Sequence, residues 1–347
     1  MAGGTGGHVF PALAIAQRLK QEGCEVLWLG TRGRMEERLV PKYGFPIEYI
    51  QVKGIRRNGL KAKLSAPFMI VHAVRQSLAV VNSFNPDVVL GMGGYASGPG
   101  GVAAWLKHIP VVLHEQNAAA GLTNRLLFKL ANRVMLGFPG AFTGSKVEVV
   151  GNPVREDLLS LYKKGKDFKR EKLHILIVGG SLGARALNTN LPKALSLFKG
   201  GICVMHQCGQ GNSEAVRKLY GDVPFDLEVS DFIDDMKSAY ENADLIVCRA
   251  GALTVAEVSA TGTPAIFVPL PTAVDDHQTK NAGFLEKKGA ALLIPEKDLV
   301  PEDLYAKILE LSEHRERLSV MSDMAYDCAI VDATDRAVAV LDSVVKD

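Results

Sequence analysis

Three glycine-rich segments, residues 3–7, 91–94 and 179–183, could bring backbone N–H groups close to an anion. Glycine permits this close approach, and the N-terminus of a following helix adds the positive end of its dipole. Together the three segments indicate a ligand that carries phosphate groups. None of them matches the GxxxxGK[ST] pattern, which excludes a P-loop.

One of these segments fits the dinucleotide-binding fingerprint, since Gly91, Gly93 and Ala96 have its spacing. We expect glycines and proline at 98–101 to interrupt the helix that must follow this fingerprint. An NAD-dependent oxidoreductase is therefore a minor alternative. The same residues indicate that the uncharged run 88–106 is a strand and a glycine-rich loop rather than a membrane span.

His8 follows the first glycine-rich segment, just ahead of a helix that we expect to begin near Pro11 and to end at Gly23. The positive end of a helix dipole disfavours an imidazolium, so a histidine placed there tends to stay neutral and able to accept a proton. His8 is our candidate general base. The alternative is a histidine that only hydrogen-bonds to the loop.

Four polar residues in a row, 114–117, end a predicted buried strand. Open α/β sheets bind ligands at the carboxyl ends of their strands, which favours a site. The alternative is a cap for a helix that begins near Thr123. Four polar groups exceed what capping needs, and we therefore favour the site.

Glu257 lies on a predicted helix that follows the strand-to-helix turn at 248–251. A carboxylate is a good acceptor for two vicinal ribose hydroxyls, although a glutamate at a helix start is also common for reasons of dipole alone. Residues 275–281 offer polar groups for sugar hydroxyls. Their two aspartates and one histidine make a weak metal site, so we expect no metal and no cofactor.

The predicted elements alternate between short β-branched runs and helical patterns, which is typical of a parallel α/β fold. The expected strands fall into two series. The first comprises residues 25–29, 47–52, 87–90, 111–114, 134–136 and 147–150, and the second comprises 173–178, 202–206, 226–229, 244–247, 265–268 and 291–294. Two Rossmann-like domains with parallel sheets facing a central cleft are the natural architecture.

The expected domain organisation is an N-terminal domain at 1–155, a linker at 156–172, a second domain at 173–330 and a C-terminal helix at 331–347 that packs back toward the first domain. The glycine-rich segment 3–7 has no strand in front of it, although such a loop is normally fed by one. We therefore expect the first strand of the N-terminal domain to be missing. Either the sequence is short at its start, or the sheet closes without that strand.

The charge is unevenly distributed, with +9 in residues 1–150 and −7 in the remainder of a chain whose net charge is +2. The basic cluster Lys53, Arg56, Arg57, Lys61 and Lys63 precedes the apolar residues Phe68 and Met69. This order suits an anionic membrane surface, the alternative being a solvated loop before a core helix. No aromatic residues interleave with the basic ones, so nucleic acid is not expected.

The five cysteines form no CxxC pair and no signal peptide is visible, which favours a cytoplasmic protein.

Seven motifs in a fixed order resemble the MurG family of bacterial N-acetylglucosaminyltransferases. They are GGTGGHVFPA (3–12), GMGGYASGP (91–99), HEQNAAAGLTN (114–124), GNPVR (151–155), GGSLGA (179–184), RAGALTVAE (249–257) and the segment 278–281. They extend along nearly the whole chain. The resemblance implies a GT-B fold in which the first domain binds the acceptor and the second binds UDP-GlcNAc.

The resemblance also implies roles for particular residues. The donor-binding positions would be Thr5, Gly6, Gly7, Asn117, Arg155, Ser181, Ile233, Ala252, Leu253, Thr254, Val255, Ala256, Glu257 and Gln278. Among these, Ser181 would contact the diphosphate, the Ile233 backbone the uracil and Glu257 the ribose. The acceptor-binding positions would be Gly93, Gly94 and Tyr95, and the membrane patch would lie in the first domain.

The implied activity is an inverting transfer of GlcNAc from UDP-GlcNAc to the 4-hydroxyl of MurNAc in lipid I, giving lipid II for peptidoglycan synthesis. His8 would take the hydroxyl proton, and Ser181 with a helix N-terminus would stabilise the departing UDP without a metal. The enzyme would sit peripherally on the cytoplasmic side of the cell membrane, together with other cell-wall synthesis proteins. The alternatives are a UDP-GlcNAc 2-epimerase and a nonenzymatic cell-wall scaffold.

Overall fold

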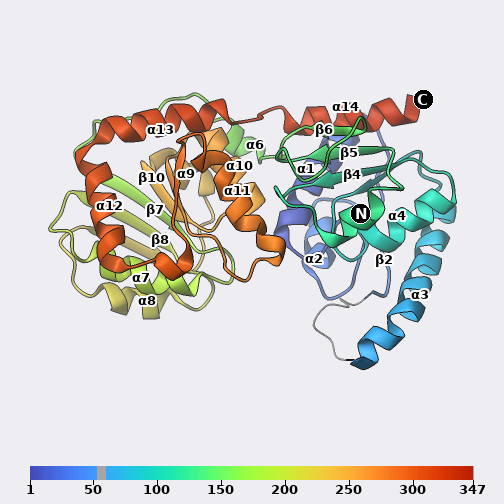
Figure 1. The fold of residues 1–347 in the computed structure, drawn as a ribbon, viewed down its shortest axis with the longest axis horizontal. Coiled ribbons are helices and arrows are strands. Elements are labelled where there is room, and N and C mark those ends of the chain that lie inside the picture. The colour runs from blue at the N-terminus through green and yellow to red at the C-terminus, as the bar shows by residue number, and fades with distance from the viewer. Residues whose placement is uncertain (53–59, 347) are drawn as a thin grey trace. The chain divides into compact units, whose positions relative to one another are not determined.

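The computed structural model describes residues 1–52 and 60–346, leaving aside the side chains of residues 60–66, 274 and 346. The chain forms two compact units, one made of Met1–Pro153 with Asp332–Asp347 and the other of Val154–Val331. Every strand pairing in both units is parallel (Figure 1). Both units therefore have the α/β architecture expected from the sequence.

The first unit contains two separate sheets. A two-stranded sheet pairs β1 (Trp28–Gly30) with β2 (Ile47–Tyr49), and a four-stranded sheet has the order β3 (Val89–Gly91), β4 (Val111–Glu115), β5 (Arg133–Leu136) and β6 (Val147–Val149). Its helices are α1 (Gly6–Gln21), α2 (Met35–Lys42), α3 (Leu60–Phe84), α4 (Ser97–Leu106), α5 (Leu122–Leu127) and α14 (Ala333–Lys346). Helix α14 packs on α1, where Asp335 accepts a hydrogen bond from Arg18 at 2.8 Å.

The second unit is a doubly wound sheet. Its strand order is β12 (Ala291–Leu293), β11 (Ala265–Phe267), β10 (Leu245–Cys248), β7 (Leu173–Val178), β8 (Ile202–Gln207) and β9 (Asp226–Ser230). Its helices are α6 (Glu156–Leu159), α7 (Arg185–Leu195), α8 (Ser213–Tyr220), α9 (Met236–Asn242), α10 (Ala252–Thr261), α11 (His277–Glu286), α12 (Pro301–Glu313) and α13 (Arg315–Asp327), with short 3₁₀ turns at Val274–Asp276 and Glu296–Asp298. Helices α7, α8 and α12 lie on one face of the sheet, and α9, α10 and α11 on the other (Figure 1).

The central strands are apolar along their whole length because helices cover both of their faces. All four residues of β10 are buried, and the core around β7 includes Leu173, Ile175 and Ile177. This pattern made the strands easy to predict. Each of the twelve expected strands is present, with ends shifted by at most a few residues.

Two helix predictions were wrong. Residues 98–101 do not interrupt a helix but belong to α4. The glycines serve close packing there: a Cβ on Gly101 would lie 2.8 Å from the side chain of Leu127. Pro99 falls in the first turn, where its missing N–H costs no hydrogen bond. Likewise α1 begins at Gly6 rather than near Pro11, because the Thr5 carbonyl already accepts from the amide of Val9 at 3.2 Å.

Residues 156–172, which we expected to form a linker, lie within the second unit. The ammonium group of Lys166 donates to the carbonyls of Tyr240 at 2.6 Å and Ala243 at 2.8 Å, and Arg170 pairs with the buried Asp244. These contacts fasten the segment to the end of α9 and the start of β10.

Candidate functional site

The carboxyl ends of the strands in the second unit lie at one edge of the sheet, because all six strands are parallel. The chain runs outward from β7 in one direction, through β8 and β9, and from β10 in the other, through β11 and β12. The topological switch point is therefore between β7 and β10, which is where open α/β sheets form their ligand crevice. The loop that follows β7 carries Ser181, and the turn that follows β10 carries Ala252.

The conformation of the loop after β7 depends on a glycine and on hydrogen bonds from a glutamine side chain. Gly183 has a φ of +76°, and a Cβ there would lie 2.1 Å from the carbonyl oxygen of Cys208. The side chain of Gln207 accepts from the amide of Gly180 and donates to its carbonyl, both at 3.0 Å. Sequence reasoning missed Gln207, although its place at the end of β8 is a signal that could have found it.

The tip of this loop is open to solvent. Ser181 and Leu182 are exposed, and α7 begins a few residues later. Within the described residues their backbone N–H groups donate to no protein acceptor. They and the N-terminus of α7 are thus available to an anion.

Side chains of α11 fix the turn after β10 through hydrogen bonds. Gln278 accepts from the amides of Ala250 at 3.3 Å and Leu270 at 2.9 Å, and the buried Asn281 donates to the Ala250 carbonyl at 3.1 Å. Arg249 donates to the carbonyl of Val268 at 3.0 Å. The turn and the start of α10, residues 252–257, are therefore fixed in place by neighbouring elements.

Glu257 projects from the second turn of α10 and keeps 19% of its side chain exposed. The phenol of Tyr240, which is fully buried in α9, donates to its carboxylate at 3.2 Å. The guanidinium of Arg155 lies 3.8 Å from its other oxygen. Burial raises the pKa of Glu257 to about 6, against the lowering effect of Arg155 and of the Tyr240 hydroxyl. The carboxylate is thus partly desolvated, held on both oxygens and still accessible to a hydroxyl donor.

The second unit also contains Ile233, half-buried in the loop after β9. This unit therefore brings Arg155, Ser181, Ile233, residues 252–257 and Gln278 to the same edge of one sheet. Sequence reasoning missed Tyr240, whose position on α9 gave no signal of its role.

His8 belongs to the first unit and lies inside the first turn of α1, not in front of it. Its Nδ1 is 3.3 Å from the hydroxyl of Thr5, the N-cap residue. The ring packs against the second glycine-rich segment, since a Cβ on Gly93 would lie 3.0 Å from Nε2. A Cβ on Gly94 would lie 2.4 Å from the carbonyl oxygen of Gly3. The two glycine-rich loops therefore touch, and His8 lies where they meet.

The buried carboxylate of Glu36 holds the first of these loops. It accepts from the amide of Gly4 at 2.9 Å, and from the amide and hydroxyl of Thr31 at 3.1 and 2.7 Å. Gly3 is required beside it, because a Cβ there would lie 2.3 Å from the same carboxylate. Sequence reasoning missed this residue, which looks like an ordinary glutamate in the first turn of α2.

Three side chains of the polar row 114–117 make hydrogen bonds within the protein. His114, Glu115 and Gln116 are buried, and burial lowers the pKa of His114 to about 4. Glu115 accepts from the amide of Gly121 at 2.9 Å, just before α5 begins. Asn117, in contrast, is half-buried just beyond the strand and donates to Glu115 at 3.2 Å.

A groove of about 1,020 Å³ in the first unit has Tyr95 and Met69 among its lining residues. Arg34 stacks over the Tyr95 ring at 5.7 Å, and Arg32 stacks over Tyr49 at 4.6 Å. Beside Met69 on α3, Phe68 is 82% exposed. The groove thus combines cationic and aromatic groups next to an apolar surface.

The side chains of the expected basic cluster lie outside the part of the chain that the structure describes. Lys53, Arg56 and Arg57 lie outside the described residues, as do the side chains of Lys61 and Lys63. Over the ranges 1–52 and 60–346, none of the helices is both long and apolar enough to cross a bilayer. Over the same ranges, no group of three or more His, Cys, Asp or Glu side chains is arranged to hold a metal.

The sequence matches glycosyltransferase family 28 in both halves, with its N-terminal domain at residues 1–136 and its C-terminal domain at 174–337. The UDP-N-acetylglucosamine--N-acetylmuramyl-(pentapeptide) pyrophosphoryl-undecaprenol N-acetylglucosamine transferase of Aeromonas hydrophila is 55% identical over 337 residues, which cover 97% of this chain and 93% of that protein. The transferase of the same name from Tolumonas auensis is 55% identical over 343 residues, or 98% and 96% of the two chains.

Among solved structures, Acinetobacter baumannii MurG superposes with a TM-score of 0.85 at 45% identity, covering 99% of this chain and 98% of that one. A UDP-GlcNAc 2-epimerase from Neisseria meningitidis gives a TM-score of 0.69 at 15% identity, covering 98% of each chain. The calicheamicin glycosyltransferase CalG4 gives 0.71 at 15% identity, covering 99% and 97%. The last two show only that the fold is the two-domain GT-B type.

Proposed function

The chain belongs to the MurG family within glycosyltransferase family 28, and from that premise we propose how its residues carry out the family's reaction. It is a UDP-GlcNAc-dependent N-acetylglucosaminyltransferase that converts lipid I to lipid II in peptidoglycan synthesis. The donor is UDP-GlcNAc and the acceptor is lipid I, the undecaprenyl-pyrophosphoryl N-acetylmuramyl-pentapeptide.

The second unit binds the nucleotide in our proposal, with its diphosphate on the loop after β7 and its ribose on Glu257. The observation that carries this assignment is the pair of features on either side of the switch point. One is a solvent-exposed glycine-rich loop whose N–H groups at Ser181 and Leu182 donate to no protein acceptor among the described residues. The other is the carboxylate of Glu257, which contacts Tyr240 and Arg155. Phosphate suits the first and vicinal hydroxyls suit the second, because an anion beside Glu257 would be repelled. Ile233 offers its backbone to the uracil, and residues 252–256 cover the nucleotide.

The sugar lies beyond the diphosphate. Gln278 uses its Oε1 to hold the turn after β10, so its amide NH₂ remains for a GlcNAc hydroxyl. Arg155 is 41% exposed, and its positive charge can reach both Glu257 and the donor diphosphate. In the first unit we propose further donor contacts for Asn117, Thr5, Gly6 and Gly7.

His8 acts as the general base. It takes the proton of the MurNAc 4-hydroxyl as that oxygen attacks the anomeric carbon from the side opposite UDP, so the α-linked donor gives a β-linked product. The imidazole is fixed before the substrate arrives by its contacts with the Thr5 hydroxyl and with Gly93. The adjoining loop is fixed by the hydrogen bond from the Gly4 amide to the Glu36 carboxylate. The departing UDP gains negative charge, which the Ser181 loop and the N-terminus of α7 stabilise.

The acceptor enters along the groove that contains Tyr95 and Met69. The cations Arg32 and Arg34 suit a pyrophosphate, and Gly93 and Gly94 leave room for the sugar beside His8. Phe68, Met69 and the basic residues 53–63 form the membrane patch that holds the enzyme peripherally on the cytoplasmic face of an anionic membrane. Other cell-wall synthesis proteins are further partners at that surface.

The function is tested by measuring UDP release from UDP-GlcNAc with and without a lipid I analogue, and by weighing the acceptor afterwards. We expect release only when the acceptor is present, and a gain of one N-acetylhexosamine per acceptor. An epimerase would convert the donor to its 2-epimer without any acceptor, and a scaffold would turn over neither substrate. Either of those results would overturn the proposal.

A further inference from the structure

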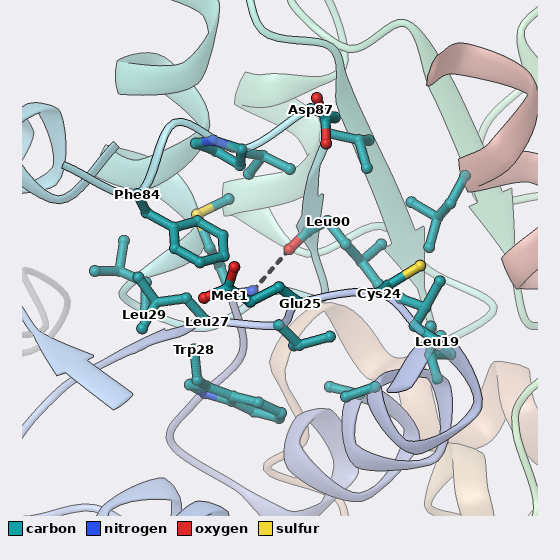
Figure 2. A pocket seen from close by; sticks show the side chains of 18 of the residues that line it. Met1, Leu19, Cys24, Glu25, Leu27, Trp28, Leu29, Phe84, Asp87 and Leu90 are labelled. Atoms are coloured by element: carbon teal, nitrogen blue, oxygen red, sulfur yellow. Dashed lines mark hydrogen bonds between the residues drawn. The ribbon is translucent and has the colours of Figure 1, made fainter. Parts of the chain in front are cut away.

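The sheet of the second unit is continuous, whereas the first unit has two separate sheets. In the first unit, the Met1 nitrogen donates to the carbonyl of Leu90 on β3, and no strand pairing joins β3 to β1 among the described residues (Figure 2). In the second unit, β7, β8 and β9 are three adjacent strands of one parallel ladder. The loops that leave these strands therefore start side by side, and a residue at the end of β8, the middle strand, can reach both neighbouring loops.

The backbone ladder of these three strands ends at the last residue of β8. On one side, the amide of Gly179 donates to the carbonyl of Gln207 at 2.9 Å. On the other side, the amide of Cys208 donates to the carbonyl of Ser230 at 2.9 Å. The residues that follow Gly179 and Ser230 leave the ladder and enter the loops after β7 and β9.

The side chain of Gln207 continues the ladder by one residue on both sides. Its Oε1 accepts from the amide of Gly180 at 3.0 Å, and its Nε2 donates to the carbonyls of Gly180 at 3.0 Å and Asp231 at 2.8 Å. These partners fix the orientation of the carboxamide, because exchanging its oxygen and nitrogen would place the oxygen against two carbonyls. One buried side chain thus joins the loop after β7 to the loop after β9.

Each of the two loops is also held by contacts of its own. The carboxylate of Asp231 accepts from the amides of Gly211 at 2.7 Å and Ser213 at 2.8 Å, which fastens the loop after β9 to the loop after β8. The loop after β7 packs against the carbonyl of Cys208 through Gly183. Loss of the glutamine carboxamide would therefore leave these contacts in place and remove the bonds that connect the two loops directly.

We propose that Gln207 is a positioning residue that sets the spacing between the phosphate and base subsites of the donor nucleotide. This role rests on the proposed function, which places the diphosphate on the loop of Ser181, one residue after Gly180, and the uracil on the backbone of Ile233, two residues after Asp231. The ribose joins the base to the diphosphate over a limited span. Two subsites that are held at that span bind UDP far more tightly than either of its fragments.

The test compares three ligands on Gln207→Met, which keeps an unbranched side chain of similar length and removes the three hydrogen bonds. We expect the Kd of UDP, measured by calorimetry, to rise by at least about 20-fold, because the subsites are no longer held at the right spacing. The Kd values of uridine and of inorganic pyrophosphate, measured by NMR titration, should each change by less than about threefold, because each loop keeps its own contacts. Gln21→Met, at an exposed position at the end of α1, is the control and should change none of the three.

The outcomes separate this role from the proposed function. Equal losses for UDP and for its two fragments would mean that Gln207 only supports the loops, and would overturn the inference, as would an unchanged Kd for UDP. A parent protein that binds both fragments but binds UDP no more tightly than either would overturn the inference alone. A parent protein that binds none of the three ligands would contradict the proposed function and this role with it.

Hydrogen exchange of the unsubstituted protein decides the question if Gln207→Met fails to fold. Uridine has no phosphate, and our proposal gives it no contact with the loop after β7. Its binding should nevertheless slow exchange of the Gly180 amide by at least about fivefold, because ordering the Asp231 carbonyl also orders Gln207, which accepts from that amide. An unchanged exchange rate at Gly180 with saturating uridine would overturn the inference.

Discussion

At the scale of single residues, the contacts of His8 suit the general base that we propose it to be. The imidazole is bonded to the Thr5 hydroxyl through Nδ1 and packs against Gly93 through Nε2. A methyl group at position 93 would occupy the space beside Nε2 of the ring that we propose as the general base. The glycine is therefore needed as much for access as for backbone conformation.

Replacing His8 tests its role directly. We expect His8→Ala to lower kcat by about 100- to 10,000-fold, the usual contribution of a general base. The Kd for UDP-GlcNAc, measured by calorimetry, should change by less than about twofold, because our proposal places the nucleotide contacts in the second unit. His108→Asn, an exposed position at the end of α4, serves as the control. Equal losses of kcat and donor affinity would contradict the assignment.

Glu257 shows a conflict between stability and binding. Its pKa is raised from 4.5 to about 6 by burial, so the folded protein holds this proton more tightly than the unfolded chain does. The contribution of this proton to the free energy of unfolding is fully present below pH 4.5. It is lost as pH rises through about 6. Above that pH the buried charge costs about 2 kcal/mol, since one pKa unit corresponds to about 1.4 kcal/mol.

We therefore predict that Glu257→Gln raises Tm by a few degrees at pH 8 and by nothing at pH 4.5, where the parent carboxyl is already protonated. The same variant should bind UDP about tenfold more weakly at pH 8, because an amide is a poorer acceptor for two ribose hydroxyls. Affinity of the parent for UDP should fall as pH drops through 6. Thermal denaturation and calorimetry across this range check both effects, with Glu313→Gln, an exposed position, as the control. A Tm gain of the same size at both pH values would contradict the account.

At the scale of elements, the glycine-rich loop after β7 depends on its contact with the neighbouring loop after β8. Gly183 and Gly209 approach so closely that a Cβ on Gly209 would lie 2.1 Å from the nitrogen of Gly183. Gln207 adds its two bonds to Gly180. The loop is thus positioned by β8 as well as by the helix that follows it.

Alanine substitutions at two glycines of this loop distinguish the effect of backbone strain from that of a steric clash. Gly180 and Gly183 both have positive φ, but only a Cβ on Gly183 would collide with backbone. We expect Gly180→Ala to weaken UDP binding less than about fivefold, from backbone strain of roughly 1 kcal/mol. Gly183→Ala should weaken it by at least about 50-fold, because the Cys208 carbonyl must move. Calorimetric titration with UDP measures both, and similar affinities in the two variants would argue against this positioning of the loop.

Elements could be predicted where neighbouring residues in the sequence determine their structure. They were missed where the structure depends on residues that are distant in sequence. Apolar runs such as 173–178 located the strands, and Gly23 correctly located the end of α1, since its φ of +87° needs glycine. The helix α4 was missed because Gly101 packs against Leu127, a residue distant in sequence. Glu36 and Tyr240 were missed for the same reason, since Glu36 acts on the loop of Gly4 and Tyr240 on Glu257 of α10, both distant in sequence.

At the scale of the whole molecule, the basic half of the chain also contains the exposed apolar residues of α3. Phe68, Ile70 and Val71 are all exposed there, and Met69 between them lines the groove beside Tyr95. A lipid-linked acceptor therefore has an apolar surface next to the groove in which our proposal places its pyrophosphate. This arrangement predicts that the patch matters for acceptors with long lipid chains.

We expect Phe68→Asp to reduce turnover of a long-chain lipid I in anionic vesicles by about tenfold or more, because the aromatic ring that our proposal places against the bilayer is replaced by a charge. Turnover of a short-chain, water-soluble analogue should stay within about twofold of the parent. Val320→Asp, at an exposed apolar position of the second unit, is the control and should affect neither. Equal losses with both acceptors would place Phe68 outside the membrane patch.

The stereochemistry of the product tests the central claim most directly, namely that this chain transfers GlcNAc to lipid I by a single inverting displacement. The reaction of UDP-GlcNAc with a soluble lipid I analogue is followed by mass spectrometry, and the new glycosidic bond is assigned by NMR. The account predicts one added N-acetylhexosamine, β-linked to the 4-hydroxyl of MurNAc, formed in step with UDP release. An α-linked product, or consumption of the donor without any change in the acceptor, would contradict it.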